Sequence, residues 1–250
     1  IIVISCKFAY IHYYIILIIL INIFLNKYFL FKGIFYLYPM NWLLFIYWPL
    51  IKYATNTPKF LQRFNIKNVD TEKVTNNIVS SIHSLGSILL NVLYFLTKSN
   101  SISSLSCLYS YSYFVYDGYL IAIKKNIENY PYLLHHLAAL IILEDINDNY
   151  NKDLLIYLYL MAEISNIPNY LIYHSIKCYP DQDLKKYKLL QVLWFSFFRV
   201  VMYTLYAKEC YEKIHHKLTK FNLFFIYFAG AYWTFGQFKG VYTSYMKKLK

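Results

Sequence analysis

Two adjacent histidines, His135 and His136, are the residues of this sequence whose type and position most clearly suggest chemistry. They lie in the run Tyr132–Leu143, which has 12 residues and is otherwise apolar after its first tyrosine. The run is shorter than the roughly 20 apolar residues that cross a bilayer core of about 30 Å. Because ionisable groups in a membrane are costly and usually face a bundle interior or a wet cavity, we expect this segment to be the inner element of a membrane bundle.

A neutral imidazole at such a position could act as a base or a nucleophile if a carboxylate oriented it. Neighbouring residues of a helix point about 100° apart, so the two rings cannot face one point equally. One ring could face a cavity while the other holds a structural hydrogen bond. No HxxxH or HExxH motif accompanies the pair, so we expect no metal site.

Asp117 and Glu163 are acidic residues inside apolar segments, and either could supply the orienting carboxylate. Glu163 and Arg199 lie near the middle of their segments, where an unpaired charge costs about 2.5–3.5 kcal/mol on insertion scales. We therefore expect Arg199 to pair with Glu163 or Asp117. For Arg199 a structural pair that fixes the helix register is favoured, whereas a structural and a catalytic role stay equally open for the two carboxylates. His83 is more typical of a local hydrogen bond than of a site.

The composition is typical of a multi-pass membrane protein. Of the 250 residues, 58% are hydrophobic and only 15% are charged. The four cysteines are scattered without a CxxC motif, which indicates neither a disulfide framework nor a zinc site. The net charge is +12, but the basic residues are spread over short loops, so we expect no nucleic-acid partner.

Eight apolar segments predict an all-α, multi-pass transmembrane helical bundle, because hydrocarbon leaves backbone groups no partners outside a helix. Six of them form a core over residues 74–246: Val74–Leu96, Leu105–Ile123, Tyr132–Leu143, Leu154–Ile176, Leu189–Ala207 and Phe221–Phe238. One or two N-terminal membrane helices, Phe8–Leu25 and Ile34–Ala54, precede the core as a hairpin over residues 1–54. Trp42 and Trp48 in the second of these suit an interfacial belt. Pro168 is expected to break and kink the fourth core helix.

The distribution of basic residues predicts the orientation of the core. If all six segments cross, 13 Lys and Arg residues lie on the side of the 55–73 linker and the C-terminus, against 6 on the other side. The linker and the C-terminus are therefore expected to be cytosolic. The basic tail 247–250 places Lys247 and Lys248 as a dilysine signal, through which coat proteins would return the chain to the endoplasmic reticulum; alternatively, the tail is only a basic segment at an anionic leaflet.

Four parts of the core resemble the TLC-domain family, which includes ceramide synthases, translocating-chain-associated membrane proteins and smaller lipid-homeostasis proteins. The similar stretches are Asn77–Asn91, Tyr111–Leu120, Tyr132–Leu140 together with Met161–Tyr170, and Leu193–Tyr203. They come in the expected order over about residues 74–246. The resemblance implies a six-helix membrane core, usually in the endoplasmic reticulum, that handles lipids or acyl chains.

Resemblance to the ceramide synthases implies a catalytic role for His135 and His136 in acyl transfer, with acyl-CoA as co-substrate and no other cofactor. That subfamily has an HDxSD-like run where this chain reads Ala162–Asn166. Glu163 with Ser165, Pro168 and Asn169 is more similar to the ExSxPxxN pattern of the smaller TLC proteins, which are linked to membrane lipid composition.

Three functional hypotheses follow. The first is a lipid-handling protein of the endoplasmic reticulum whose intramembrane polar site binds an acyl chain or a lipid. The second is an acyl-CoA-dependent N- or O-acyltransferase acting on a sphingoid base or a lysolipid. The third is a non-catalytic membrane chaperone or trafficking adaptor. The candidate catalytic residues are His135 and His136, and the candidate lipid-binding residues are Asp117, Glu163, Ser165, Asn166, Asn169, Arg199 and His83.

Overall fold

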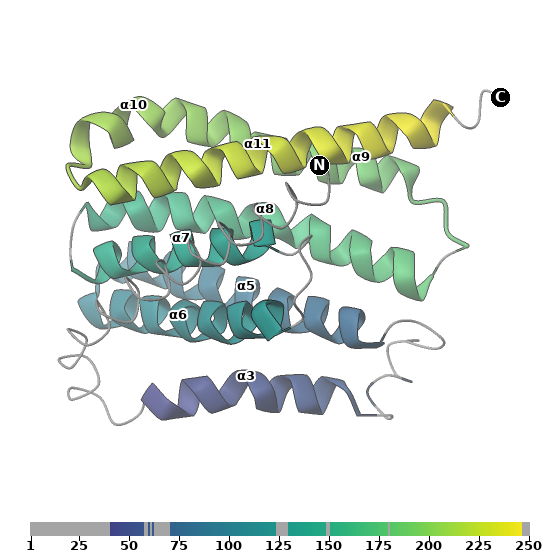
Figure 1. The fold of residues 1–250 in the computed structure, drawn as a ribbon, viewed down its shortest axis with the longest axis horizontal. Coiled ribbons are helices and arrows are strands. Elements are labelled where there is room, and N and C mark those ends of the chain that lie inside the picture. Colours follow the sequence, from purple (N-terminus) through teal and green to yellow (C-terminus); the bar gives the residue numbers. More distant parts are fainter. Residues whose placement is uncertain are drawn as a thin grey trace, which may run out of the picture. The chain divides into compact units, whose positions relative to one another are not determined.

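The computed structural model describes residues 41–57, 60, 62, 71–123, 130–148, 151–179 and 181–246. Every regular element in these ranges is a helix, which confirms the predicted all-α class (Figure 1). The chain divides into two compact units, Ile1–Leu43 and Leu44–Lys250, and the second is the one described below. The predicted segment Phe8–Leu25, most of the 55–73 linker and the tail 247–250 lie outside the described residues.

The six predicted core segments correspond to the helices that follow the linker. The elements are α3 (Asn41–Thr55), α5 (Thr71–Thr97), α6 (Asn100–Ile123), α7 (Tyr130–Asn147), α8 (Lys152–Cys178), α9 (Lys185–Ser196), the π-helix η2 (Phe197–Met202), α10 (Tyr203–Lys213) and α11 (Lys217–Met246). Because α9, η2 and α10 follow one another without a break, they form the fifth core helix together. By length and composition, Thr71–Thr97 and Lys185–Lys213 are the two helices among the described residues that are long and apolar enough to cross a membrane.

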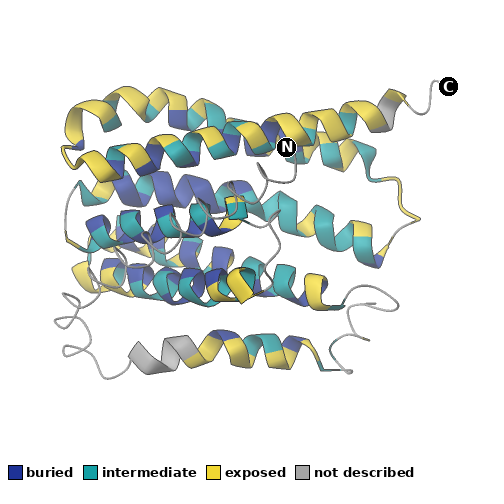
Figure 2. Cartoon of the chain, viewed as in Figure 1, coloured by how far each residue is buried: buried dark blue, intermediate teal, exposed yellow. Residues whose placement is uncertain are grey.

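Helix α5 buries its polar residues and exposes its large apolar ones. His83, Ser87 and Asn91 are each at most 1% exposed, whereas Leu85 and Leu89 are 57% and 60% exposed. Figure 2 shows that the outward side of α11 is also exposed along much of its length. A helix in a membrane places small and polar residues against its neighbours and apolar residues toward lipid. The burial pattern of α5 is therefore what a membrane bundle requires.

The contact between α5 and α6 depends on small side chains. The hydroxyls of Ser87 and Ser110 lie 2.9 Å apart across this interface. One residue earlier in α5, Gly86 faces the ring of Tyr109, and a Cβ added to this glycine would lie only 2.4 Å from the tyrosine hydroxyl oxygen. That hydroxyl donates to the carbonyl of Ile82 over 3.1 Å. The missing side chain of Gly86 thus gives Tyr109 the room to reach the backbone of α5.

Helix α3 is attached to the core by Trp48. The indole is fully buried, and its Nε1 donates to Ser112 Oγ on α6 over 2.9 Å. The ring also lies edge-on to His83 and Tyr113, with centroids 5.7 and 5.1 Å away. The prediction that Trp48 lies in an interfacial belt is therefore wrong, because the indole fills a site between α5 and α6 instead.

We predict that Gly86→Ala destabilises the protein, because the new Cβ would collide with Tyr109. Overpacking of this kind typically costs about 1–3 kcal/mol. The matched control is Gly236→Ala on α11, where an added Cβ meets nothing within 4 Å. That variant should be neutral or slightly stabilised, since alanine is the better helix former. Melting temperatures of the two purified variants in detergent provide the measurement, and equal melting temperatures would contradict the prediction.

Candidate intramembrane polar site

His136 on α7 is oriented by Asp117 on α6. The Nε2 atom of His136 lies 2.9 Å from Oδ2 of Asp117, and the side chains are 11% and 21% exposed. The imidazole packs against Phe114, with ring centroids 5.1 Å apart. Since the carboxylate accepts a hydrogen bond from Nε2 in the neutral tautomer, it leaves Nδ1 as the acceptor. Nδ1 is buried and has no hydrogen-bond partner among the described residues.

His135 has different neighbours, as expected for adjacent helical positions. Its ring lies 5.9 Å from that of His136 and edge-on to Trp233 of α11 at 5.4 Å. Trp233 in turn stacks on Tyr132, with centroids 5.4 Å apart. Nδ1 of His135 is also buried without a partner in the described part of the chain. Neither the role of Trp233 nor the proximity of α11 was predicted from the sequence.

Arg199 lies in the π-helix η2 and is only 3% exposed. Its Nε donates to Ser165 Oγ over 2.8 Å, and its Nη2 lies 3.5 Å from Asn166 Oδ1. The expected ion pair with Glu163 or Asp117 is therefore not formed; Arg199 binds two neutral side chains of α8, and Asp117 pairs with His136. Nη1 of Arg199 has no partner among the described residues.

Gly230 on α11 makes room for the stem of Arg199. A Cβ added to Gly230 would lie 3.3 Å from Cβ and 3.6 Å from Cδ of the arginine. One turn further along α11, Thr234 is buried with a hydroxyl that has no partner in the described residues. π-Helical turns are frequent at functional sites because they turn a side chain out of the regular register. The sequence alone does not indicate this arrangement, because Gly230 and Arg199 lie on different helices and their contact is seen only in the structure.

Glu163 of α8 is the acidic residue that interacts with both His136 and Arg199. It is 4% exposed, and its backbone carbonyl accepts a hydrogen bond from Ser84 Oγ over 3.0 Å. The side chain interacts electrostatically with Arg199 and His136, and Arg199 interacts with His135 as well. Oε2 of Glu163 is buried without a partner among the described residues.

We call the atoms Nδ1 of His135, Nδ1 of His136, Oε2 of Glu163 and Nη1 of Arg199 the polar site. Buried polar atoms in native proteins almost always have a hydrogen-bond partner, because an unpaired one costs free energy. Here four such atoms belong to residues of α7, α8 and η2 that influence one another electrostatically, and each atom still has unused hydrogen-bonding capacity. Together they offer acceptors, a carboxyl group and a cationic donor to a ligand.

Two other predicted residues have partners of their own. His83 bonds Ser87 Oγ at 3.1 Å and stacks on Tyr113 at a centroid distance of 3.9 Å, which is the local arrangement that its sequence context favoured. Asn169 Oδ1 accepts a hydrogen bond from Gln191 Nε2 over 2.8 Å and so joins α8 to α9. In the described ranges, no three His, Cys, Asp or Glu side chains are grouped as metal ligands would be.

Helix α8 continues through Pro168 without a break, contrary to expectation. Proline cannot donate to the carbonyl four residues earlier, which is that of Ile164. Trp194 of α9 donates its Nε1 to this carbonyl over 3.0 Å. The indole thus replaces the missing helical hydrogen bond and holds α9 against α8 just before η2 begins.

The TLC domain family model matches residues 73–238. This match covers more than half of the chain, so the protein belongs to the TLC-domain family. The predicted membrane bundle with a six-helix TLC core is thereby confirmed, together with the family's general link to lipid handling. No curated protein and no solved structure matches the chain.

We predict that Trp194→Phe destabilises the protein by about 1 kcal/mol, because the carbonyl of Ile164 loses its donor. In a Pro168→Ala background the same change should cost much less, since residue 168 then donates to that carbonyl itself. A double-mutant cycle, measured as free energies of unfolding in mixed micelles, isolates this coupling. An equal loss in both backgrounds would show that the indole acts only through packing.

Proposed function

We propose that this protein is a lipid-handling protein of the endoplasmic reticulum whose polar site binds the polar end of a lipid or an acyl chain. The observation that carries the proposal is the convergence of buried, unpaired polar atoms in a membrane domain. Arg199 carries a positive charge whose hydrogen-bond partners, among the residues that the structure describes, are Ser165 and Asn166. An anionic or carbonyl group of a lipid would complement this charge, and the acyl chain would lie among the apolar helices.

A second candidate function is acyl transfer, and it is favoured by the Asp117–His136 contact. A carboxylate on Nε2 leaves Nδ1 of His136 as a general base that can activate a nucleophile. His136 would take a proton from an amine or hydroxyl acceptor while that group attacks the thioester carbonyl of acyl-CoA. The tetrahedral intermediate would then expel the CoA sulfur, which would receive the proton from His136. The cationic Arg199 would stabilise the intermediate oxyanion.

We further propose that the C-terminus is cytosolic and that Lys247 and Lys248 bind coat proteins there. The Lys and Arg distribution supports a cytosolic C-terminus, and the resemblance to smaller TLC proteins supports a role in membrane lipid composition. A non-catalytic chaperone or adaptor role remains the alternative if no lipid occupies the polar site.

We predict that the purified chain retains lipid and that His136→Ala and Glu163→Gln each lower the lipid content by about tenfold. The expected loss follows from removing a hydrogen bond to a charged or polar group in a buried site. Lipids extracted from the detergent-purified protein are quantified by mass spectrometry. His215→Ala is the matched control, because His215 is an exposed histidine outside the polar site.

The same preparations and an Asp117→Asn variant are incubated with labelled acyl-CoA and with sphingoid or lysophospholipid acceptors. Product that depends on both His136 and Asp117 would assign acyl transfer, whereas retained lipid without product would assign binding alone. Lipid content and product that are equally low in wild type and all variants would contradict both functions and leave the adaptor role.

A further inference from the structure

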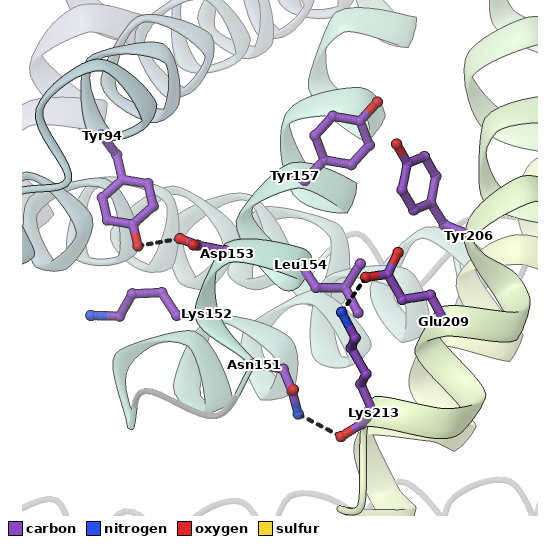
Figure 3. A pocket seen from close by; sticks show the side chains of 9 residues that line it. All are labelled: Tyr94, Asn151, Lys152, Asp153, Leu154, Tyr157, Tyr206, Glu209 and Lys213. Carbon is purple, nitrogen blue, oxygen red and sulfur yellow. Dashed lines mark hydrogen bonds and ion pairs between the residues drawn. The ribbon is translucent and has the colours of Figure 1, made fainter.

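A pocket of about 560 Å³ lies at the end of the bundle where α5 ends, α8 begins and α10 ends (Figure 3). Its volume is within the range of about 300–1,000 Å³ that is usual for small-molecule sites. We call this pocket the end pocket. It is near the end of α7, because only three residues separate that end from the turn that starts α8. The histidine pair lies near the start of α7 and does not line the end pocket.

The end pocket is lined by two basic and two acidic side chains, Lys152, Lys213, Asp153 and Glu209. Lys152 donates to Asn100 Oδ1 over 3.1 Å. On the side of α5 and α8, Asp153 accepts hydrogen bonds from Tyr94 at 2.6 Å and Lys98 at 3.1 Å. The hydrogen bond from Tyr94 is the largest cause, and together with that from Lys98 it holds the pKa of Asp153 below its ordinary value. On the side of α10, Lys213 Nζ lies 2.6 Å from Glu209 Oε1. A ligand with one net charge would leave one member of a pair without compensation, whereas a zwitterion matches both signs.

The Glu209–Lys213 pair is the more easily displaced position for such a ligand, because Asp153 has both Tyr94 and Lys98 as partners. Both side chains are more than a third exposed, and exposed ion pairs between residues four apart in a helix contribute little to stability. A zwitterion can therefore replace this pair at low cost, with its anion on Lys213 and its cation on Glu209. The second carboxylate oxygen of Glu209 already points toward two tyrosines rather than toward the lysine (Figure 3).

Those tyrosines are Tyr157 of α8 and Tyr206 of α10. Their ring centroids are 4.8 Å apart and their planes are tilted by 53°. Two angled aromatic faces beside a carboxylate are the surroundings that amines and quaternary ammonium groups prefer. Figure 3 shows both rings on the wall of the end pocket above Glu209.

We propose that the end pocket binds the headgroup of a zwitterionic phospholipid, with the phosphate on Lys213 and the ammonium group against Glu209, Tyr157 and Tyr206. The ends of membrane helices lie at the level of lipid headgroups. Leu96 of α5 and Leu205 of α10 are exposed on the helices that form the pocket, so that acyl chains have apolar surface beside it. This site is separate from the polar site, and neither proposal depends on the other.

The test uses the full-length chain in an uncharged detergent and titrates it with dioctanoylphosphatidylcholine, with bound lipid measured by native mass spectrometry. Lys213→Ala and Tyr206→Leu should each weaken binding by about tenfold, because each removes a contact to a charged group. Lys208→Ala is the matched control: it removes a lysine from the same helix and from an ion pair of the same spacing, that with Glu212. This variant should bind as the wild type does.

Two further ligands test the chemistry of the headgroup and its source. Dioctanoylphosphatidylglycerol, which has a phosphate but no amine, should bind several-fold more weakly than the phosphatidylcholine. Soluble phosphocholine should also bind more weakly, because it lacks the acyl chains. The proposal is overturned if both pocket variants bind phosphatidylcholine as the wild type does, or if Lys208→Ala weakens binding as much as they do. It is also overturned if phosphatidylglycerol or phosphocholine binds the wild type as tightly as phosphatidylcholine. Melting temperatures of all variants establish that a loss of binding is not a loss of folding.

Discussion

The structure depends on one constraint: polar groups that are withdrawn from water must find their partners inside the bundle. Helix α8 shows how side chains of its neighbours meet this constraint. Tyr203 donates to the carbonyl of Leu158, and Trp194 donates to the carbonyl that Pro168 leaves without a helical partner. These bonds connect α8 to the fifth core helix on both sides of the π-helical section. The four atoms of the polar site are among the buried atoms for which the described residues supply no partner, and the proposed function assigns a lipid group as that partner.

Glu163 and Arg199 illustrate the difference between holding a fold together and keeping a site available. A direct ion pair would satisfy both charges and would only fix the helix register. Instead Arg199 is held by Ser165 and Asn166, with Gly230 providing the space for its stem. Its charge stays uncompensated by any carboxylate within ion-pairing distance in the described residues. A bound lipid group of opposite charge or of carbonyl character would supply that compensation.

The sequence was sufficient to predict the helical class, the core segments and the possibility that Asp117 orients a histidine. It could not predict the contacts that depend on the rotation of one helix against another. Helix α11 is apolar around most of its circumference, so its sequence does not reveal that Gly230 faces Arg199. In the same way, the sequence predicts an interfacial belt for Trp48 because tryptophan is common there, but it does not reveal that the hydroxyl of Ser112 offers the indole a buried acceptor.

The proposed function requires that the polar site holds a lipid group rather than structural hydrogen bonds alone. An electron cryo-microscopy structure of the chain in lipid nanodiscs tests it most directly. We predict density for a lipid polar group about 3 Å from Nδ1 of His136 or Nη1 of Arg199, continuous with an acyl chain. If protein side chains, including those of residues 1–40, occupy these hydrogen-bonding positions instead, the polar site does not bind a lipid.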